Sequence, residues 1–93
     1  MQEFLNSVKT ALRIKSTAYD SEIIDLINAC KGDLVLAGIA SSHFDPDDAL
    51  IKRAVITYCK ANFGFNEESE KYMNAYLMIK MHLTLSADYK EEI

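Results

Sequence analysis

The side chains that could carry out chemistry are few in this sequence, and their spacing fits no catalytic or metal site. The chain has two cysteines, Cys30 and Cys59, which lack the Cys-x-x-Cys spacing of a zinc or redox motif. The two histidines, His43 and His82, add no matching ligand spacing. Because free cysteine packs as a small hydrophobic residue, we expect both thiols to be buried and reduced. We expect no catalytic residue, no metal ligand and no cofactor.

An acidic cluster at Asp45, Asp47 and Asp48 is a further candidate for binding an ion. It lacks the alternating oxygen ligands, the glycine and the final glutamate of a calcium loop. Carboxylates are also favourable near the N-terminus of a helix, where the helix dipole is positive. We therefore interpret the cluster as a helix start, with Asp45 as the N-cap, Pro46 in the first turn and Gly64 at the helix end.

Hydrophobic periodicity predicts three further helices and no strand. Asp20 is expected to cap the second helix and Gly38 to end it, and Asn66 is expected to cap the fourth. The four predicted helices cover approximately residues 2–12, 20–37, 46–63 and 67–83. The sequence thus predicts an all-α fold, a compact bundle of about four short helices. It forms a single domain, residues 1–89, followed by a short tail, residues 90–93.

The fourth predicted helix carries more apolar surface than the third. On the third helix the predicted buried arc comprises Leu50, Ile51, Ala54, Val55 and Tyr58. On the fourth, at 100° per residue, the apolar arc spans roughly 200°, about twice the minimum stripe of a surface helix. Either the fourth helix is the central core helix, or part of its surface is a subunit contact. For the second interpretation the predicted contact residues are Ile56, Tyr72, Met73, Tyr76 and Leu77.

Composition is typical of one small soluble domain, with 93 residues of which 49% are hydrophobic and 26% charged. A chain this short buries roughly 60–70% of its unfolded surface, so that self-association would add useful burial. The start of the chain lacks the basic and apolar stretches of a signal peptide, and no apolar run is long enough to span a membrane. We therefore expect a reducing intracellular compartment and no membrane contact.

The charge balance argues against a general nucleic-acid binder, because the formal net charge is −4 and the pI is about 5.0. Two groups of basic residues could still contact phosphate. They are Lys9, Arg13 and Lys15 in the first half of the chain, and Lys52, Arg53 and Lys60 in the second. Because acidic residues outnumber basic ones in both halves, we interpret both groups as solvated helix faces.

Four segments together carry a family resemblance. The first, residues 8–14, reads Val-Lys-Thr-Ala-Leu-Arg-Ile and is followed by residues 20–30, which open at an acidic cap. The third, residues 50–64, reads Leu-Ile-Lys-Arg-Ala-Val-Ile-Thr-Tyr-Cys-Lys-Ala-Asn-Phe-Gly, and the fourth, residues 72–89, ends in Leu-Thr-Leu-Ser-Ala-Asp-Tyr. In order and spacing these segments resemble the small helical head-tail connector proteins of long-tailed bacteriophages and prophages. The resemblance covers about Glu3 to Tyr89.

The resemblance implies a virion structural protein rather than an enzyme. It implies a homo-oligomer, a dodecameric ring beneath the portal protein that bridges the portal to a tail-side or stopper protein and leaves a channel through which DNA passes. The implied location is the head-tail junction of the virion, and the host cytoplasm during assembly. With such a channel, Arg53 and Lys60 are the residues we expect to face DNA. The chain departs from longer relatives in its short loop, residues 38–45, and its brief tail.

Two other interpretations are compatible with the sequence. A DNA-binding packaging factor, such as a small terminase-like protein, would also be small and helical, but no segment is dense in the Arg, Lys, Asn and Gln of a recognition helix. A generic helical protein-interaction module is the other alternative, because each segment alone is an ordinary amphipathic helix.

Overall fold

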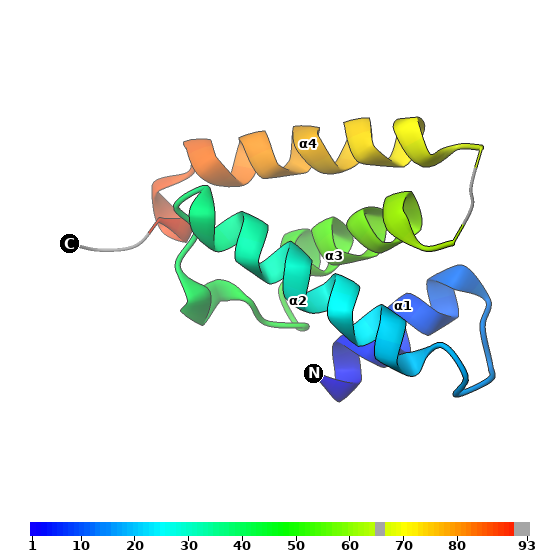
Figure 1. Ribbon diagram of the computed structural model, residues 1–93. Coiled ribbons are helices and arrows are strands. Elements are labelled where there is room, and N and C mark those ends of the chain that lie inside the picture. Colours follow the sequence, from blue (N-terminus) through cyan, green and yellow to red (C-terminus); the bar gives the residue numbers. More distant parts are fainter. Residues whose placement is uncertain (65–66, 91–93) are drawn as a thin grey trace.

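The computed structural model describes residues 1–64 and 67–90, and the fold of these residues is all-α (Figure 1). Its elements are α1 (Gln2–Leu12), α2 (Asp20–Leu36), the 3₁₀ turn η1 (Ser41–His43), α3 (Ala49–Asn62), α4 (Ser69–Leu85) and the 3₁₀ turn η2 (Ala87–Tyr89). No strand occurs within the two described ranges, where a single antiparallel bridge joins Ile39 to Lys90. The predicted bundle of about four short helices is confirmed.

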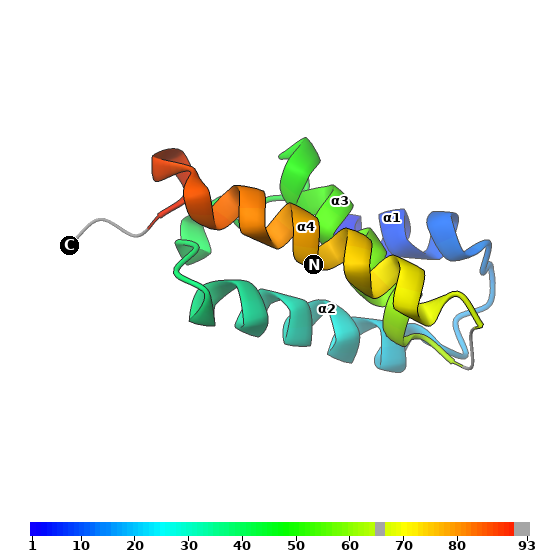
Figure 2. The same ribbon diagram turned by 90° about the horizontal axis from the view of Figure 1, so that it is seen from above.

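The central helix of the bundle is α3, which contacts α1, α2 and α4. In Figure 1, α4 lies above α3 and α1 lies below it, while the view from above in Figure 2 places α2 along one side. The molecule is elongated, with extents of 41 × 26 × 19 Å. The interpretation of the fourth helix as the central core helix is therefore wrong, because α4 is an outer helix with one face turned away from the bundle.

The core is formed by the apolar arcs of the four helices, and α4 contributes least to it. Its buried apolar residues are Phe4, Leu5 and Val8 of α1, Ile23, Ile27, Cys30 and Leu34 of α2, Ile51, Ala54, Val55 and Cys59 of α3, and Tyr76 and Leu83 of α4, joined by Ile39. Leu50 was expected in the core but is 50% exposed, because it lies in the first turn of α3 at the edge of the buried arc. Tyr58 packs against the core while only partly buried.

Two of the predicted N-cap residues, Asp45 and Asp20, are not the caps in the structure. The third helix begins at Ala49, three residues later than predicted from Pro46, and Asp48 caps it by accepting hydrogen bonds from the backbone N–H groups of Leu50 and Ile51. Asp45 instead begins a turn: its carbonyl accepts from the N–H of Asp48 at 3.0 Å. Proline is favoured at the second position of such a turn, which is where Pro46 lies.

At the second helix, Asp20 is the first helical residue rather than the cap, and Tyr19 occupies the N-cap position without a side-chain hydrogen bond. The predicted stop at Gly38 is confirmed: α2 ends at Leu36, and Gly38 has a φ of 101°, which glycine adopts without a steric penalty. The predicted cap Asn66 lies outside the described residues. The fourth helix begins at Ser69, whose hydroxyl donates to the carbonyl of Ala61 at 2.7 Å and so ties α4 to the end of α3.

The C-terminal segment fastens the loop between α2 and α3. The carbonyl of Tyr89 accepts a hydrogen bond from the N–H of Ala40 at 2.8 Å, next to the bridge between Ile39 and Lys90. The Tyr89 hydroxyl donates to Asp48 Oδ2 at 2.9 Å, so that one carboxylate both caps α3 and binds η2. Desolvation and this hydrogen bond raise the pKa of the Tyr89 hydroxyl above its usual value.

The two thiols are free and buried, as predicted. Burial raises the pKa of both Cys30 and Cys59 to about 12, because a thiolate is poorly solvated in the core. Since only the thiolate reacts with alkylating agents, we expect iodoacetamide at pH 8 to label the native chain at least about 100-fold more slowly than the urea-unfolded chain. Mass spectrometry of timed samples measures both rates, and native labelling at the unfolded rate would contradict the burial.

Candidate interaction surfaces

The outer face of α4 carries a row of exposed apolar side chains, which we call the outer stripe: Leu77, Met78, Met81 and Leu85. Their exposed fractions are 45%, 60%, 51% and 75%. Residues four apart lie one above another on a helix, so Leu77, Met81 and Leu85 form a continuous line on the side opposite the buried Tyr76 and Leu83. No described element covers this line.

The outer stripe has an acidic N-terminal end. Glu70 lies seven residues, or two helical turns, before Leu77 and is therefore on the same side of α4. Glu67 precedes the helix, and both carboxylates are exposed. Acidic residues at a helix N-terminus interact favourably with the helix dipole, which accounts for their position here. Where the helix begins, its outer face thus carries Glu70 together with the exposed Lys71, which lies two turns before Met78 and pairs with Glu68, and where the helix ends this face is apolar.

Tyr76 attaches α4 to the end of α2. Its hydroxyl donates to Asp33 Oδ2, and the same oxygen accepts from Lys80 Nζ at 3.1 Å. Burial alone would raise the pKa of Asp33, but the hydrogen bonds from Tyr76 and Lys80 and the Lys80 charge outweigh it and lower the pKa below its usual value. Tyr76 was predicted as a contact residue, yet it is only 1% exposed, so that its side chain is inside the fold.

Tyr72 and Met73, two further predicted contact residues, are half-buried. Met73 packs against the core, and the ring of Tyr72 lies near two ammonium groups, with Lys60 Nζ at 5.2 Å and Lys71 Nζ at 5.8 Å from its centre. These distances are within the range of a cation–π contact. Of the predicted contact residues on α4, Leu77 is the one that belongs to the exposed surface.

Shallow hollows that share lining residues lie along α1 and the N-terminal half of α3. The first hollow has a volume of about 340 Å³ and is lined by Pro46, Asp47, Ala49, Lys52, Arg53 and Ile56. A second hollow, of about 390 Å³, shares Lys52 and Ile56 and is completed by Asn6, Ser7, Thr10 and Ala11. Ile56, predicted as a contact residue, is half-buried and lies where the two hollows join.

A third hollow lies along the end of α1. It has a volume of about 290 Å³, shares Thr10 with the second, and is lined by Lys9, Arg13, Ile14 and Lys15 as well. We call the three hollows together the basic groove. Five basic side chains line it, and Asp47 is the acidic one among its lining residues. The fold thus brings most of both basic groups of the sequence onto one surface.

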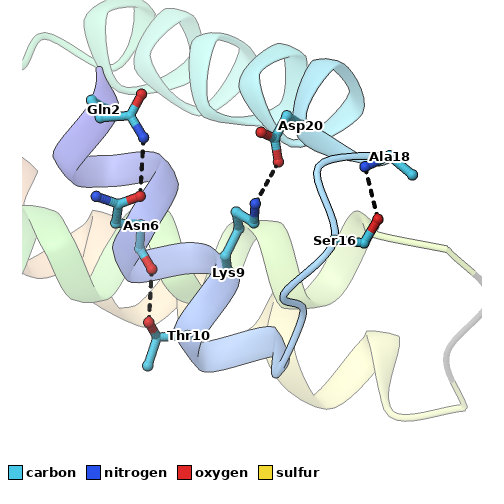
Figure 3. A network of polar contacts seen from close by, with 7 residues as sticks. All are labelled: Gln2, Asn6, Lys9, Thr10, Ser16, Ala18 and Asp20. Atoms are coloured by element: carbon cyan, nitrogen blue, oxygen red, sulfur yellow. Dashed lines mark hydrogen bonds and ion pairs between the residues drawn. The ribbon is translucent and has the colours of Figure 1, made fainter.

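An ion pair supports the α1 side of the basic groove. Lys9 Nζ lies 2.8 Å from Asp20 Oδ1 at the start of α2, and both side chains are largely buried (Figure 3). On the neighbouring turns of α1, the Thr10 hydroxyl donates to the carbonyl of Asn6 at 2.9 Å, and Gln2 donates to the Asn6 side chain at 3.0 Å. Lys9 therefore holds α1 against α2, while the other basic residues of the groove are exposed.

The comparison with protein families is decisive for the class of protein. Residues 4–90 match the family described as phage connector protein. The chain belongs to this family. The resemblance to phage connectors is thereby confirmed over nearly the whole sequence. Neither the search of curated proteins nor the search of solved structures found a match. The role of this connector is thus that of a phage structural protein.

The two basic residues predicted for a DNA channel occupy different surroundings in the connector. Arg53 and Lys60 lie two turns apart on one side of α3. Arg53 is exposed and lines the first hollow, whereas Lys60 is half-buried beside Tyr72. Arg53 is therefore open to a partner, and Lys60 is held by its own chain.

Within residues 1–64 and 67–90, no three His, Cys, Asp or Glu side chains are placed to hold a metal ion together. A hollow of about 530 Å³ between η1 and η2 is lined by small and polar residues, with His43 and Asp88 among them. His43 lies beside the ring of Tyr89, at 5.3 Å between centres, and His82 is exposed.

No helix in the described part of the connector has the length and apolar character needed to cross a bilayer. The residue that sequence reasoning did not single out is Leu85, which completes the exposed line with Leu77 and Met81. Their spacing was visible in the sequence. Which side of α4 would stay uncovered was not, because that depends on the packing of α4 onto α3.

Proposed function

We propose that this chain is a ring-forming head-tail connector of a long-tailed phage or prophage, and not an enzyme. In this role it links the portal to a tail-side or stopper protein and leaves a channel for DNA, at the head-tail junction of the virion after assembly in the host cytoplasm. The observation that carries the proposal is the family match over residues 4–90. The uncovered outer stripe supports it, since a ring subunit needs apolar surface for its neighbours.

Deleting the gene from the phage that encodes it tests this role directly. We expect filled heads and separate tails in electron micrographs of the lysate, and loss of infectious particles, because the joint between head and tail is missing. Supplying the wild-type chain in trans should restore joined virions. Normal virions in the absence of the chain would contradict the proposed function.

Self-association is the second part of the proposal. Native mass spectrometry over a concentration series should show an assembly near twelve times the 10.5 kDa chain mass. The candidate contact residues are Ile56 and Leu77, with Tyr72 and Met73 at the margin. If the chain is monomeric alone but forms a ring when the portal protein is added, the linking role still holds. Ring formation then requires the portal.

We also propose that Arg53 and Lys60 contact the DNA that passes through the ring. The double substitution Arg53→Glu/Lys60→Glu is expected to reduce genome packaging or retention, because two cations on the channel wall become anions. Nuclease-protected DNA per particle is the measurement, and Lys31→Glu/Lys90→Glu is a control of equal charge change at exposed lysines elsewhere. Unchanged DNA content in the Arg53/Lys60 variant would end this proposal.

A DNA-binding packaging factor is the second candidate function, and the basic groove is the observation that favours it. Against it stand the net charge of −4 and the apolar Ile56 within the groove. Titration with duplex DNA at low salt separates the two functions, because phosphate binding by several cations is strong there and weakens steeply as salt is added.

A further inference from the structure

We propose that the outer stripe of one chain docks in the basic groove of a second copy, so that neighbouring subunits make a head-to-tail contact through two different surfaces. This inference rests on the proposed function in one respect, that the occupant of the groove is another copy of the chain. It deepens that function by naming both sides of the contact.

Charge complementarity is the first argument. Glu70 lies on the outer face of α4 near its N-terminal end and Glu67 lies in the turn before the helix, and both are exposed. The exposed Lys71 beside them is paired with Glu68. The basic groove presents Arg13, Lys15 and Lys52, which are exposed as well, against a single acidic lining residue. Complementary charges across an interface fix its register and disfavour wrong pairings. An acidic end and a basic groove on the same chain therefore fit each other across two copies.

Apolar surface is the second argument. The side chains of the outer stripe are between 45% and 75% exposed, and Ile56 offers an apolar patch where two hollows of the groove meet. A symmetric contact of stripe on stripe would place Glu70 against either another Glu70 or the apolar end at Leu85. In the second arrangement the carboxylate has no basic partner, and in the first the nearby cation is Lys71, which already pairs with Glu68. Docking into the groove supplies both an apolar contact and a cation.

The positions of the two surfaces exclude a contact within one chain. The outer face of α4 points away from α3, and α1, which forms one wall of the groove, lies on the other side of α3 (Figure 1). A contact between different patches on two sides of a subunit continues from copy to copy. It closes into a ring when the rotation between copies permits, and otherwise forms a filament.

Two charge reversals test the pairing. The acid-reversed chain carries Glu67→Lys/Glu70→Lys, and the base-reversed chain carries Lys15→Glu/Lys52→Glu. Alone, each would bring like charges together at every contact, and we expect the concentration needed for assembly to rise at least about tenfold. Mixed in equal amounts, they should assemble at the wild-type concentration, because alternating copies restore opposite charges at every contact. Sedimentation velocity measures the assembly of each sample.

Matched controls separate the contact from general charge effects. Glu22→Lys/Asp25→Lys also reverses two exposed acids in the first turns of a helix, here α2, and Lys31→Glu/Lys90→Glu reverses two exposed lysines outside the groove. Both controls should assemble like the wild type. Circular dichroism confirms that each variant keeps its helices, since all eight substituted side chains are at or near the surface.

A second pair of variants tests the apolar half of the contact. Leu85→Ser removes an apolar side chain of the outer stripe that is 75% exposed, whereas Leu36→Ser removes one on α2 that is 89% exposed. We expect the first to weaken assembly severalfold and the second to leave it unchanged. The reverse result would overturn the placement of the contact on α4.

Three outcomes overturn the inference. They are assembly of either reversed chain alone at the wild-type concentration, failure of the mixture to recover, and a wild-type chain that stays monomeric at every concentration. Loss of duplex DNA binding in the base-reversed chain with unchanged assembly would assign the groove to nucleic acid instead. None of these results affects the head-tail joining role, which the gene deletion tests separately.

Discussion

A Tyr76→Asp chain is expected to be largely unfolded at 25 °C, with the helical signal in circular dichroism lost. Replacing a buried aromatic side chain by a small one costs roughly 3–5 kcal/mol, and this aspartate would also be buried beside Asp33. Domains of this size have a total stability of about 5–15 kcal/mol, so that a loss of this size removes most of it. If Tyr76 were a surface contact residue, the variant would instead be a folded monomer.

Matched variants separate the aromatic ring from its hydroxyl. Tyr72→Asp, at a half-buried position on the same helix, should stay folded and act as the control. Tyr76→Phe keeps the packing and loses only the hydrogen bond to Asp33, which should cost about 1–3 kcal/mol in urea unfolding. A folded Tyr76→Asp chain with a cooperative urea transition like that of the wild type would contradict the burial of this residue.

The same network predicts how stability depends on pH in acid. The pKa of Asp33 is lowered in the folded chain, so its contribution is fully present above the ordinary aspartate pKa of about 3.9 and is lost as pH falls through the folded value. The Tyr76 hydroxyl is one of the groups that lower this pKa. In Tyr76→Phe we therefore expect a smaller loss of stability between neutral pH and pH 3 than in the wild type.

The second large effect is expected for Asp48→Ala, which should lower the free energy of unfolding by about 2–5 kcal/mol. Two contributions add: the N-cap of α3 is worth roughly 0.5–2 kcal/mol, and the charged hydrogen bond from Tyr89 roughly 1.5–3 kcal/mol. Because the second partner comes from η2, the substitution should also release the C-terminal segment. Hydrogen exchange at the N–H of Ala40, which bonds to Tyr89, reports that release.

Substitutions of Asp45 and of Tyr89 serve as controls for Asp48→Ala. Asp45→Ala removes only an exposed turn contact, the hydrogen bond to the N–H of Asp47, and should cost well under half as much. Tyr89→Phe removes the hydroxyl alone, and a double-mutant cycle with Asp48→Ala should give a coupling energy of about 0.5–3 kcal/mol. A coupling of zero, or equal costs for Asp45→Ala and Asp48→Ala, would contradict the dual role of Asp48.

Helix positions followed from the sequence because hydrophobic periodicity is a local property. The first helix, Gln2–Leu12, has the predicted bounds, and the second ends one residue before the predicted Ala37. The start of the third was misplaced because Asp45 and Asp48 both suit an N-cap. In the folded chain Asp48 is the cap, and its carboxylate also binds Tyr89, which lies 41 residues further along the chain.

The candidate surfaces were only partly predictable. Ile56 and Leu77 were named from the sequence, and the structure leaves Ile56 half-buried and Leu77 exposed, whereas Tyr76 was named on the same pattern and is buried. The wide apolar arc on α4 indicates that some of its apolar residues lie outside the core. It does not indicate which of them do. This is decided by the rotation of α4 on α3, which the hydrogen bond of Tyr76 to Asp33 helps to hold.

The sequence by itself determined the all-α class, the order of the helices and membership of the phage connectors, because each depends on local patterns or on their spacing along the chain. Tertiary structure alone decided that α3 is central and α4 external. It also joined two basic groups, some 40 residues apart in sequence, into one groove by packing α1 against α3. Packing of distant segments has no local signal, so the surfaces that it creates become visible only in the folded chain.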